Sequence, residues 1–478
     1  MDSLIFIIYL IGLVAVGVLT ARWITTAEEY YVAGRRLKLW LAFSTIAATW
    51  IGGGITIGVA GKAYAGQAIG LWGTTIGFGT TLILIGLFYA GPLHRLRLYT
   101  LADYFTVRFG RAWVGGLSAI IMLVAYIFAV TAQVVAGSKL LQVVFGWSNA
   151  LAVIVSGGIV VLYTLLGGLW AVSLTDFIQI TLTFVGVLIA LVFALAKAGV
   201  SNVVSTAAGD LGLLDPRVIL AIDFWALVIV LALGDIPAPD LAQRIFASKD
   251  SDTARKSSLL AGLSYYTVGV LSMLIGAAAY LLFPRLDDPE LAYPMLIKGV
   301  LPVGIAGVVL AGLMAAVMSN ADSMLLAPAT VAAKNIIKDL LKPDMSDRGL
   351  LMVSRATVLV IGVIAIVAGL ARAEVLYWLI LAFDVLFASL FVPLTLGLWW
   401  KRFNRAGAVA AILSGALSRI LLEYALNAGW IEQWWIASLG APLISLIAGV
   451  LVTLVTPPPS DEELKAYYKA RETVGFKS

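Results

Sequence analysis

Two aspartates lie within stretches of sequence that are otherwise apolar enough to span a bilayer. Asp176 is in LLGGLWAVSLTDFIQ, and Asp322 is in MAAVMSNADSMLL, where Ser319 is three residues from Asp322 and four from Ser323. On a helix these spacings, with Asn320, place oxygen-bearing side chains on one face or its margin. A charge at bilayer depth costs about 2.5–3.5 kcal/mol and needs a partner or a function. Oxygen ligands without nearby His or Cys suit a hard cation such as sodium. The alternative is that both aspartates hydrogen-bond between helices as structural groups.

Two apolar stretches also contain residues that break helices. TWIGGGITIG (residues 49–58) has three consecutive glycines, each costing about 1 kcal/mol of helix stability relative to alanine. GDIPAPD (residues 234–240) has two prolines, which remove backbone donors. Paired interruptions in equivalent halves are typical of the midplane site of a transporter, where non-helical backbone lines a polar cavity. The alternative is that the glycines only permit close helix packing.

The composition predicts an all-α polytopic membrane protein to hold these segments. Hydrophobic residues make up 61% of the 478 residues, charged residues only 12%, and the mean hydropathy is +1.00. The absence of cysteine excludes disulfides and thiolate metal sites. Breaks in the second and seventh spans predict two five-helix units. We predict thirteen spans, near residues 4–21, 39–61, 69–91, 113–143, 149–166, 170–196, 218–243, 258–283, 299–333, 351–371, 375–399, 406–428 and 435–455.

Charge placement predicts the orientation in the membrane. With the N-terminus outside, the cytoplasmic connections and tail hold 23 of the 32 lysines and arginines, against seven on the opposite side. Arg244 is counted among the cytoplasmic residues. This bias explains the net charge of +5 without nucleic-acid binding. We therefore expect a multi-pass protein of the cell (inner) membrane with a cytoplasmic C-terminus, whose tail from about Pro457 to Ser478 forms a short amphipathic helix.

Four motifs resemble those of the sodium:solute symporter family, which contains sodium-coupled proline, sugar, sialic acid, pantothenate and choline carriers. They are ATWIGGG through GVAGKAY, GGLWAVSLTDFIQ, LALGDIPAPDLAQRIFASKD and AAVMSNADSMLLAPATVAAKNI, in the order expected across most of the chain. The resemblance implies a five-plus-five inverted repeat of the leucine-transporter type, with one extra helix before it and two after it. The implied units are residues 1–37 (extra helix and cytoplasmic loop), 38–200 (first repeat), 217–400 (second repeat) and 401–478 (two helices and cytoplasmic tail).

The resemblance also implies where sodium binds. The conserved sodium site maps onto backbone carbonyls beside the first break and residues of the ninth span: Ala48, Ile51, Ala316, Ser319 and Asn320. Asn320 departs from the Ser or Thr usual in the family, although its amide oxygen can ligate sodium. A second sodium site, present in some members, maps onto Asp176, Asp322 and Ser323.

The motifs are nearest those of the choline-carrier branch, where aromatic rings enclose a quaternary ammonium. Trp50, Phe78 and Phe128 are aromatic at matching positions, but the position in the seventh span falls on Ala238, with Asp235 and Asp240 nearby. This departure leaves other amines, amino acids and small carboxylates open as substrates. The candidate substrate contacts are Trp50, Gly53, Phe78, Phe128, Gln133, Asp235 and Ala238.

The predicted function is therefore sodium-coupled symport of a small organic solute by alternating access, with no enzymatic chemistry. Two alternatives remain: a proton-coupled carrier using Asp176 and Asp322, and a channel or non-transporting sensor. Substrate identity, sodium stoichiometry and oligomeric state stay open. Within the spans, Arg419 and Glu423 are spaced to form an ion pair, and Asp384 and Arg355 are candidates for a pair between helices.

Overall fold

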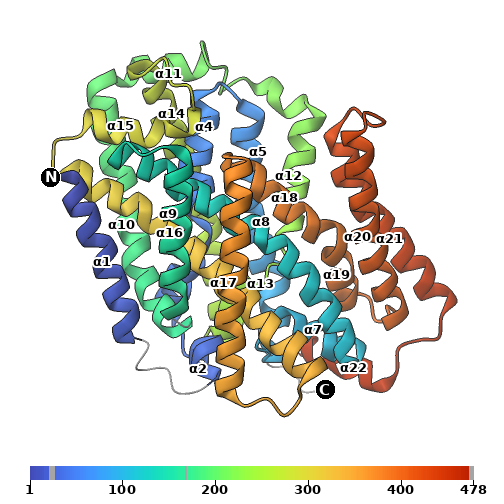
Figure 1. The fold of residues 1–478 in the computed structure, drawn as a ribbon. Helices are drawn as coiled ribbons and strands as arrows, with labels where there is room; N and C mark the ends of the chain where they lie inside the picture. Colours follow the sequence, from blue (N-terminus) through green and yellow to red (C-terminus); the bar gives the residue numbers. More distant parts are fainter. Residues whose placement is uncertain (21–26, 167–168, 473–478) are drawn as a thin grey trace.

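The computed structural model describes residues 1–20, 27–166 and 169–472. The described residues form helices, and their β structure is limited to one isolated bridge between Leu37 and Ser248. Figure 1 shows α1 (Asp2–Thr20) along one flank and α20 (Arg405–Asn427) with α21 (Trp434–Val455) along the other. The short helices gather at the two ends of the bundle, α11 and α15 at one end and α2, α7 and α22 at the other. Their bounds are Ala27–Val32 (α2), Leu101–Phe109 (α7), Val200–Ala208 (α11), Ala292–Val300 (α15) and Asp461–Arg471 (α22).

The long helices confirm the predicted fold class. In the described part of the chain, nine helical stretches are long and apolar enough to cross a membrane, two bent pairs of helices would add two more, and two further apolar stretches are shorter. Each predicted span falls on one of these. The central helices are α3 (Leu39–Trp50) with α4 (Val59–Tyr64), α5 (Ala68–Leu84) with α6 (Ala90–Leu96), α8 (Ala112–Phe145), α9 (Asn149–Leu166), α10 (Leu169–Ala198), α12 (Ile222–Gly234) with α13 (Pro239–Ala247), α14 (Ser251–Leu282), α16 (Ile305–Val331), α17 (Asp347–Ala371) and α18 (Val375–Leu386) with α19 (Val392–Trp399).

Several helices continue through wider or tighter turns. π-helical segments lie between α3 and α4, between α5 and α6 and between α18 and α19, and a fourth extends α16. Short 3₁₀ turns lie in three connections. Such turns let one span change direction without losing its backbone hydrogen bonds. The π-helical segments are Gly54–Gly58, Ile85–Tyr89, Ala332–Leu341 and Phe387–Phe391, and the 3₁₀ turns are Ala33–Arg35, Pro216–Leu220 and Pro289–Leu291.

Both predicted breaks are present. α3 bends by 54° into the segment Gly54–Tyr64, and α12 bends by 47° into α13. In the second break, Pro237 and Pro239 lack an N–H, and Ala238 is extended between them. α16 packs against α3, α8, α10 and α13, so both broken spans face the same central helices.

The tail helix α22 begins where the sequence predicts it. Ser460 and Glu463 form a capping box, with Glu463 N–H donating to Ser460 Oγ and Ser460 N–H donating to the Glu463 carboxylate. The helix packs against α6 and α7, and Arg108 from α7 donates to the Glu463 carbonyl. α22 is therefore a helix docked on the end of the bundle.

Candidate functional site

The three glycines at the first break permit both a kink and close packing. A Cβ at Gly52 would lie 2.3 Å from Asn320 Nδ2, one at Gly53 would lie 2.3 Å from Ala136 Cβ, and one at Gly54 would lie 2.5 Å from Leu379 Cδ1. α8, α16 and α18 thus approach the broken backbone more closely than any side chain allows. The glycines therefore lie both at a bend of the span and at a point where three helices converge.

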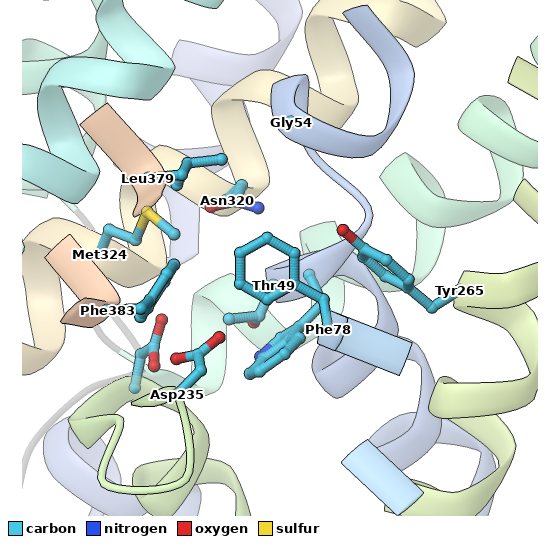
Figure 2. Close-up of a pocket in the computed structure, with 11 residues that line it drawn as sticks. Thr49, Gly54, Phe78, Asp235, Tyr265, Asn320, Met324, Leu379 and Phe383 are labelled. Carbon is cyan, nitrogen blue, oxygen red and sulfur yellow. The ribbon is translucent and has the colours of Figure 1, made fainter. Parts of the chain in front are cut away.

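A small cavity, of about 20 Å³, lies between the two breaks. Figure 2 shows Phe78, Tyr265 and Phe383 around it, with Asp235 below them in this view. Its walls come from six elements that are distant in the sequence: α3, α5, the second break with α13, α14, α16 and α18. The lining residues are Thr49, Trp50, Gly54, Phe78, Asp235, Asp240, Tyr265, Asn320, Met324, Leu379 and Phe383.

Four aromatic rings form part of the cavity wall. The centroid of Phe78 lies 5.9 Å from that of Trp50, 6.0 Å from that of Tyr265 and 5.2 Å from that of Phe383, all edge to face. The π face of such a ring attracts a cation that lies within about 6 Å of the ring centroid. Tyr265 and Phe383 were not predicted, because nothing in the apolar sequences of α14 and α18 distinguishes them from packing residues.

Two buried carboxylates belong to the same cavity. Asp235 ends α12, and Asp240 is in the first turn of α13; both are 2% exposed, and their charges repel each other. Asp240 Oδ1 accepts from the hydroxyl of Tyr126 at 2.5 Å and from the N–H of Leu241 at 2.7 Å. No hydrogen bond or ion pair of the Asp235 side chain is found within the described ranges. The cavity therefore contains a carboxylate without a counter-charge.

The other predicted substrate contacts lie around or beyond this cavity. Gln133 Oε1 accepts from the Gly53 N–H at 3.2 Å, so Gln133 satisfies a backbone donor at the first break. Ala238 is fully buried between the prolines, outside the lining. Phe128 stacks on Trp378 at 5.9 Å, also outside it. Of the predicted set, the cavity is lined by Trp50, Phe78 and Asp235.

The residues predicted to bind sodium lie where α3 ends against α16. Ala48 and Ile51 flank the last turn of α3, whose final carbonyls lack partners within the helix. Asn320 is 3% exposed, its Oδ1 has no hydrogen-bond partner among the described residues, and its Nδ2 is next to Gly52. Ser319 and Ala316 are buried on the preceding turn of α16. An unsatisfied amide oxygen beside free carbonyls fits a monovalent hard cation.

Asp176 lies at the centre of a buried polar cluster. It accepts hydrogen bonds from the hydroxyls of Ser319 and Thr45, and its Oδ2 lies 3.9 Å from Arg244 Nη2. Arg244 is fully buried and also donates to Ser323 Oγ, to the Thr45 carbonyl at 3.2 Å and to the Asp240 carbonyl at 3.0 Å. The prediction that placed Arg244 in a cytoplasmic loop is wrong: the helical spacing from Asp240 carries it into the bundle.

Two other intramembrane aspartates lie in different surroundings. Asp322 is buried near Thr164 of α9 and near Asp176 and Arg244, and its Oδ2 has no hydrogen-bond partner among the described residues. Asp384 pairs with Arg419 at 2.7 Å, whereas Arg355 is exposed. The predicted pair between Arg419 and Glu423 is confirmed at 2.8 Å.

Ion pairs close one end of the bundle above the cavity. Lys139 at the end of α8 is 1% exposed and donates to Asp288 Oδ2 at 2.5 Å and to the Ala373 carbonyl at 2.9 Å. Glu290 Oε1 accepts from the Val375 N–H at 2.9 Å, and its Oε2 lies 3.5 Å from Lys139 Nζ. This gate cluster (Lys139, Asp288, Glu290) ties α8, the connection before α15 and the start of α18 together.

Two broken spans around a buried, charged cavity in an all-helical membrane bundle define a secondary transporter. The sodium:solute symporter family model matches residues 30–415. The chain belongs to the sodium:solute symporter family. Its members couple solute movement to sodium, so the chain is a sodium-coupled transporter of the membrane.

The similar proteins are named after different solutes. The human high affinity choline transporter 1 is 32% identical over 82% of this chain and 70% of its own length. The osmoregulated proline transporter OpuE of Bacillus subtilis is 28% identical over 97% of this chain and 95% of its own. A solved sodium-coupled sialic acid symporter shares the fold with a TM-score of 0.79 and 20% identity, covering 96% of this chain and 98% of that one.

Proposed function

We propose that this protein imports a small organic cation, carrying a protonated or quaternary ammonium group, together with sodium. The observation that supports this most strongly is Asp235, a buried carboxylate without a counter-charge in a cavity whose wall carries four aromatic rings. An unpaired buried charge costs several kcal/mol unless a ligand compensates it. A cation supplies that compensation and also gains cation–π attraction from the rings. The similarity to choline transporters supports the same class of solute.

The helix ends support a cation in the same place. α3 ends at Trp50 and α12 ends at Gly234, so the C-terminal ends of two helices meet the site. A helix C-terminus carries about half an elementary negative charge in its unpaired carbonyls. Both C-terminal ends favour positive charge beside the cavity, where sodium is proposed to bind, whereas the N-terminus of α13 at Pro239 has the opposite sign.

We place the coupling sodium on Ala48, Ile51, Ala316, Ser319 and Asn320. The residues of the second candidate site, Asp176, Ser323 and Asp322, are a weaker choice, because Arg244 already compensates Asp176 and donates a hydrogen bond to Ser323 Oγ. One sodium contributes about 2.3 kcal/mol per 100 mV of membrane potential. A tenfold gradient adds about 1.4 kcal/mol. Together these support accumulation of the solute by several hundredfold.

Alternating access is proposed to occur between the units at residues 38–200 and 217–400, which contribute one broken span each. We place the gate cluster on the extracellular face and the C-terminal helix α22 on the cytoplasmic face, in the cell (inner) membrane. The positive-inside bias supports this orientation.

The charge of the substrate can be tested with isosteric ligands. Purified protein is heated with choline or with its neutral isostere 3,3-dimethyl-1-butanol, in sodium or in potassium buffer, with proline and pantothenate as zwitterionic and anionic comparisons. A ligand that binds the folded state raises the melting temperature. We expect stabilisation by the cation, in sodium only. Equal stabilisation by the neutral isostere, or stabilisation by the anion alone, would contradict the proposal.

The sodium assignment predicts that Ser319→Ala raises the half-saturating sodium concentration for uptake about tenfold, since one oxygen ligand is lost. Substrate affinity at saturating sodium should change little. Ser323→Ala, which removes a hydroxyl bonded to Arg244, is the matched control and should leave sodium activation near the wild-type value. Uptake in proteoliposomes at varied sodium measures both. A larger effect of Ser323→Ala would move the coupling site to the Asp176 cluster.

The gate cluster predicts a pH dependence. Burial raises the pKa of Glu290 to about 7 from its ordinary 4.5, with Asp288 and Glu374 adding to the rise and Lys139 opposing it. When the gate opens, Glu290 becomes hydrated and its pKa returns toward the ordinary value. The closed state then binds the proton more tightly, so closure is favoured as pH falls from about 7 to 4.5, and this advantage is lost above 7.

Spin-label distances can measure this gate. The native chain lacks cysteine, so Asp287→Cys in the connection before α15 and Ala371→Cys at the end of α17, two residues before Ala373, provide two exposed labelling positions beside the gate cluster. We expect the long-distance population to grow as pH rises through 7. Glu290→Gln should flatten that dependence, and a pH response that survives this substitution would assign it to another group.

A further inference from the structure

A second cavity, of about 350 Å³, lies between α5, α12, α18, α20 and α21. It shares no lining residue with the central cavity. The two are separated by α18, where Phe383 lines the central cavity and the next residue, Asp384, lines the second one. Its volume is in the range of a small-molecule site.

Two buried polar atoms on its wall lack partners. Asp384 is 1% exposed; its Oδ2 accepts from Arg419 Nε at 2.8 Å and from Ser438 Oγ at 2.7 Å, while its Oδ1 has no hydrogen-bond partner among the described residues. Thr74 is fully buried, and its Oγ1 also lacks a partner there. Buried polar atoms are normally hydrogen-bonded, so two unpartnered ones on one cavity wall indicate that a ligand completes them.

The charges of the wall favour a cation. It carries three carboxylates, Asp223, Asp384 and Glu423, against Arg419 and Lys62. Lys62 is engaged by Glu374 outside the cavity at 3.3 Å, and Asp223 accepts from the indole N–H of Trp434 rather than from a cation. The Arg419 guanidinium is shared between Asp384 and Glu423. The wall therefore has an excess of negative charge.

The remaining wall is apolar, with Leu227, Leu376 and Ile380 among its members. An unpartnered carboxylate oxygen and a hydroxyl oxygen both accept hydrogen bonds from a ligand with N–H donors, which a quaternary ammonium does not have. We propose that this cavity is a second binding site, specific for a primary ammonium group attached to an apolar body. A free alkylamine and the headgroup of phosphatidylethanolamine share this chemistry. The proposal does not depend on the substrate of the central cavity.

Calorimetric titration of the full-length protein with hexylammonium tests the site. The protein is held in nanodiscs of phosphatidylglycerol, and hexyltrimethylammonium is the matched probe without N–H donors. We expect hexylammonium to bind at least about tenfold more tightly than hexyltrimethylammonium. Thr74→Val and Asp384→Asn should each weaken hexylammonium by about tenfold, and Leu381→Trp should block it by filling the cavity. Thr74→Val removes a hydroxyl without a partner, so it keeps the test valid if Asp384→Asn fails to fold.

A titration of Asp235→Asn distinguishes binding at the second site from binding at the central cavity. This variant should retain hexylammonium binding at the second site. Replacing part of the phosphatidylglycerol with phosphatidylethanolamine distinguishes the two sources: competition identifies the lipid headgroup as the occupant, and unchanged affinity identifies a free amine. Hexylammonium binding that is absent, that is lost in Asp235→Asn, or that is the same in wild type, Thr74→Val and Leu381→Trp would overturn the proposal.

Discussion

Asp235→Asn is expected to raise the half-saturating concentration of a cationic solute by about 100-fold or more. Truncating one partner of a buried charge pair costs about 3–5 kcal/mol, and each 1.4 kcal/mol is a factor of ten. Asp235 is the carboxylate available for this pairing, because the Oδ1 atom of Asp240 is already bound by Tyr126 and Leu241. Initial uptake rates in proteoliposomes, at saturating sodium and varied solute, measure the change.

Three comparisons make this result specific to charge compensation. Sodium alone should still stabilise Asp235→Asn, since the proposed sodium ligands are on α3 and α16. The neutral isostere of choline should lose its disadvantage in this variant. Asp252→Asn removes an exposed carboxylate paired with Lys256 and should behave as wild type. Near-normal uptake of the cation by Asp235→Asn would show that the rings alone select the solute.

Asp176→Asn is expected to destabilise the protein by about 3 kcal/mol or more and to abolish uptake. The variant leaves the fully buried Arg244 without its carboxylate, and an uncompensated buried charge costs about 3–5 kcal/mol. Arg244→Gln should destabilise the protein by a similar amount, because it leaves the buried Asp176 carboxylate without its cation. Because this pair joins α10 to α13, either loss loosens the second broken span.

The double variant Asp176→Asn with Arg244→Gln is the decisive comparison. If the pair acts by mutual compensation, the double variant should be more stable than either single one, since no charge remains buried. Thermal unfolding followed by tryptophan fluorescence, together with sodium activation of uptake, measures both consequences. If the destabilisation of the double variant equals the sum of those of the two single variants, the two residues act independently.

The sequence predicted the interrupted spans well because the relevant physics is local. Glycine and proline weaken a helix wherever they occur, and the bends at Gly52–Gly54 and Pro237–Pro239 follow from the backbone itself. The family resemblance, rather than this local physics, supplied Trp50 and Phe78, and Asp235 was noted beside the second break. Neither found Tyr265 or Phe383, because an aromatic residue in an apolar span has the same local signature whether it faces a cavity or packs against a helix.

Charged residues show the limit of local reasoning more clearly. Arg244 follows a predicted span and was counted with the loop charges, yet the bend before α13 carries it into the bundle beside Asp176. Asp384 meets Arg419 of α20 rather than Arg355. Each outcome depends on the rotation of a helix about its own axis.

By itself, the sequence determined the membrane class, the positions of the spans, the two breaks and the family. Length, hydropathy and backbone chemistry act within a single segment, and the bilayer converts them directly into helices. Only the tertiary structure decided which side chains share a cavity, that Asp235 there has no counter-charge, and which cations pair with Asp176 and Asp384. Such relations join segments far apart in the sequence, as Asp2 on α1 accepts from the Gly304 N–H 302 residues away, and arise only when the helices pack.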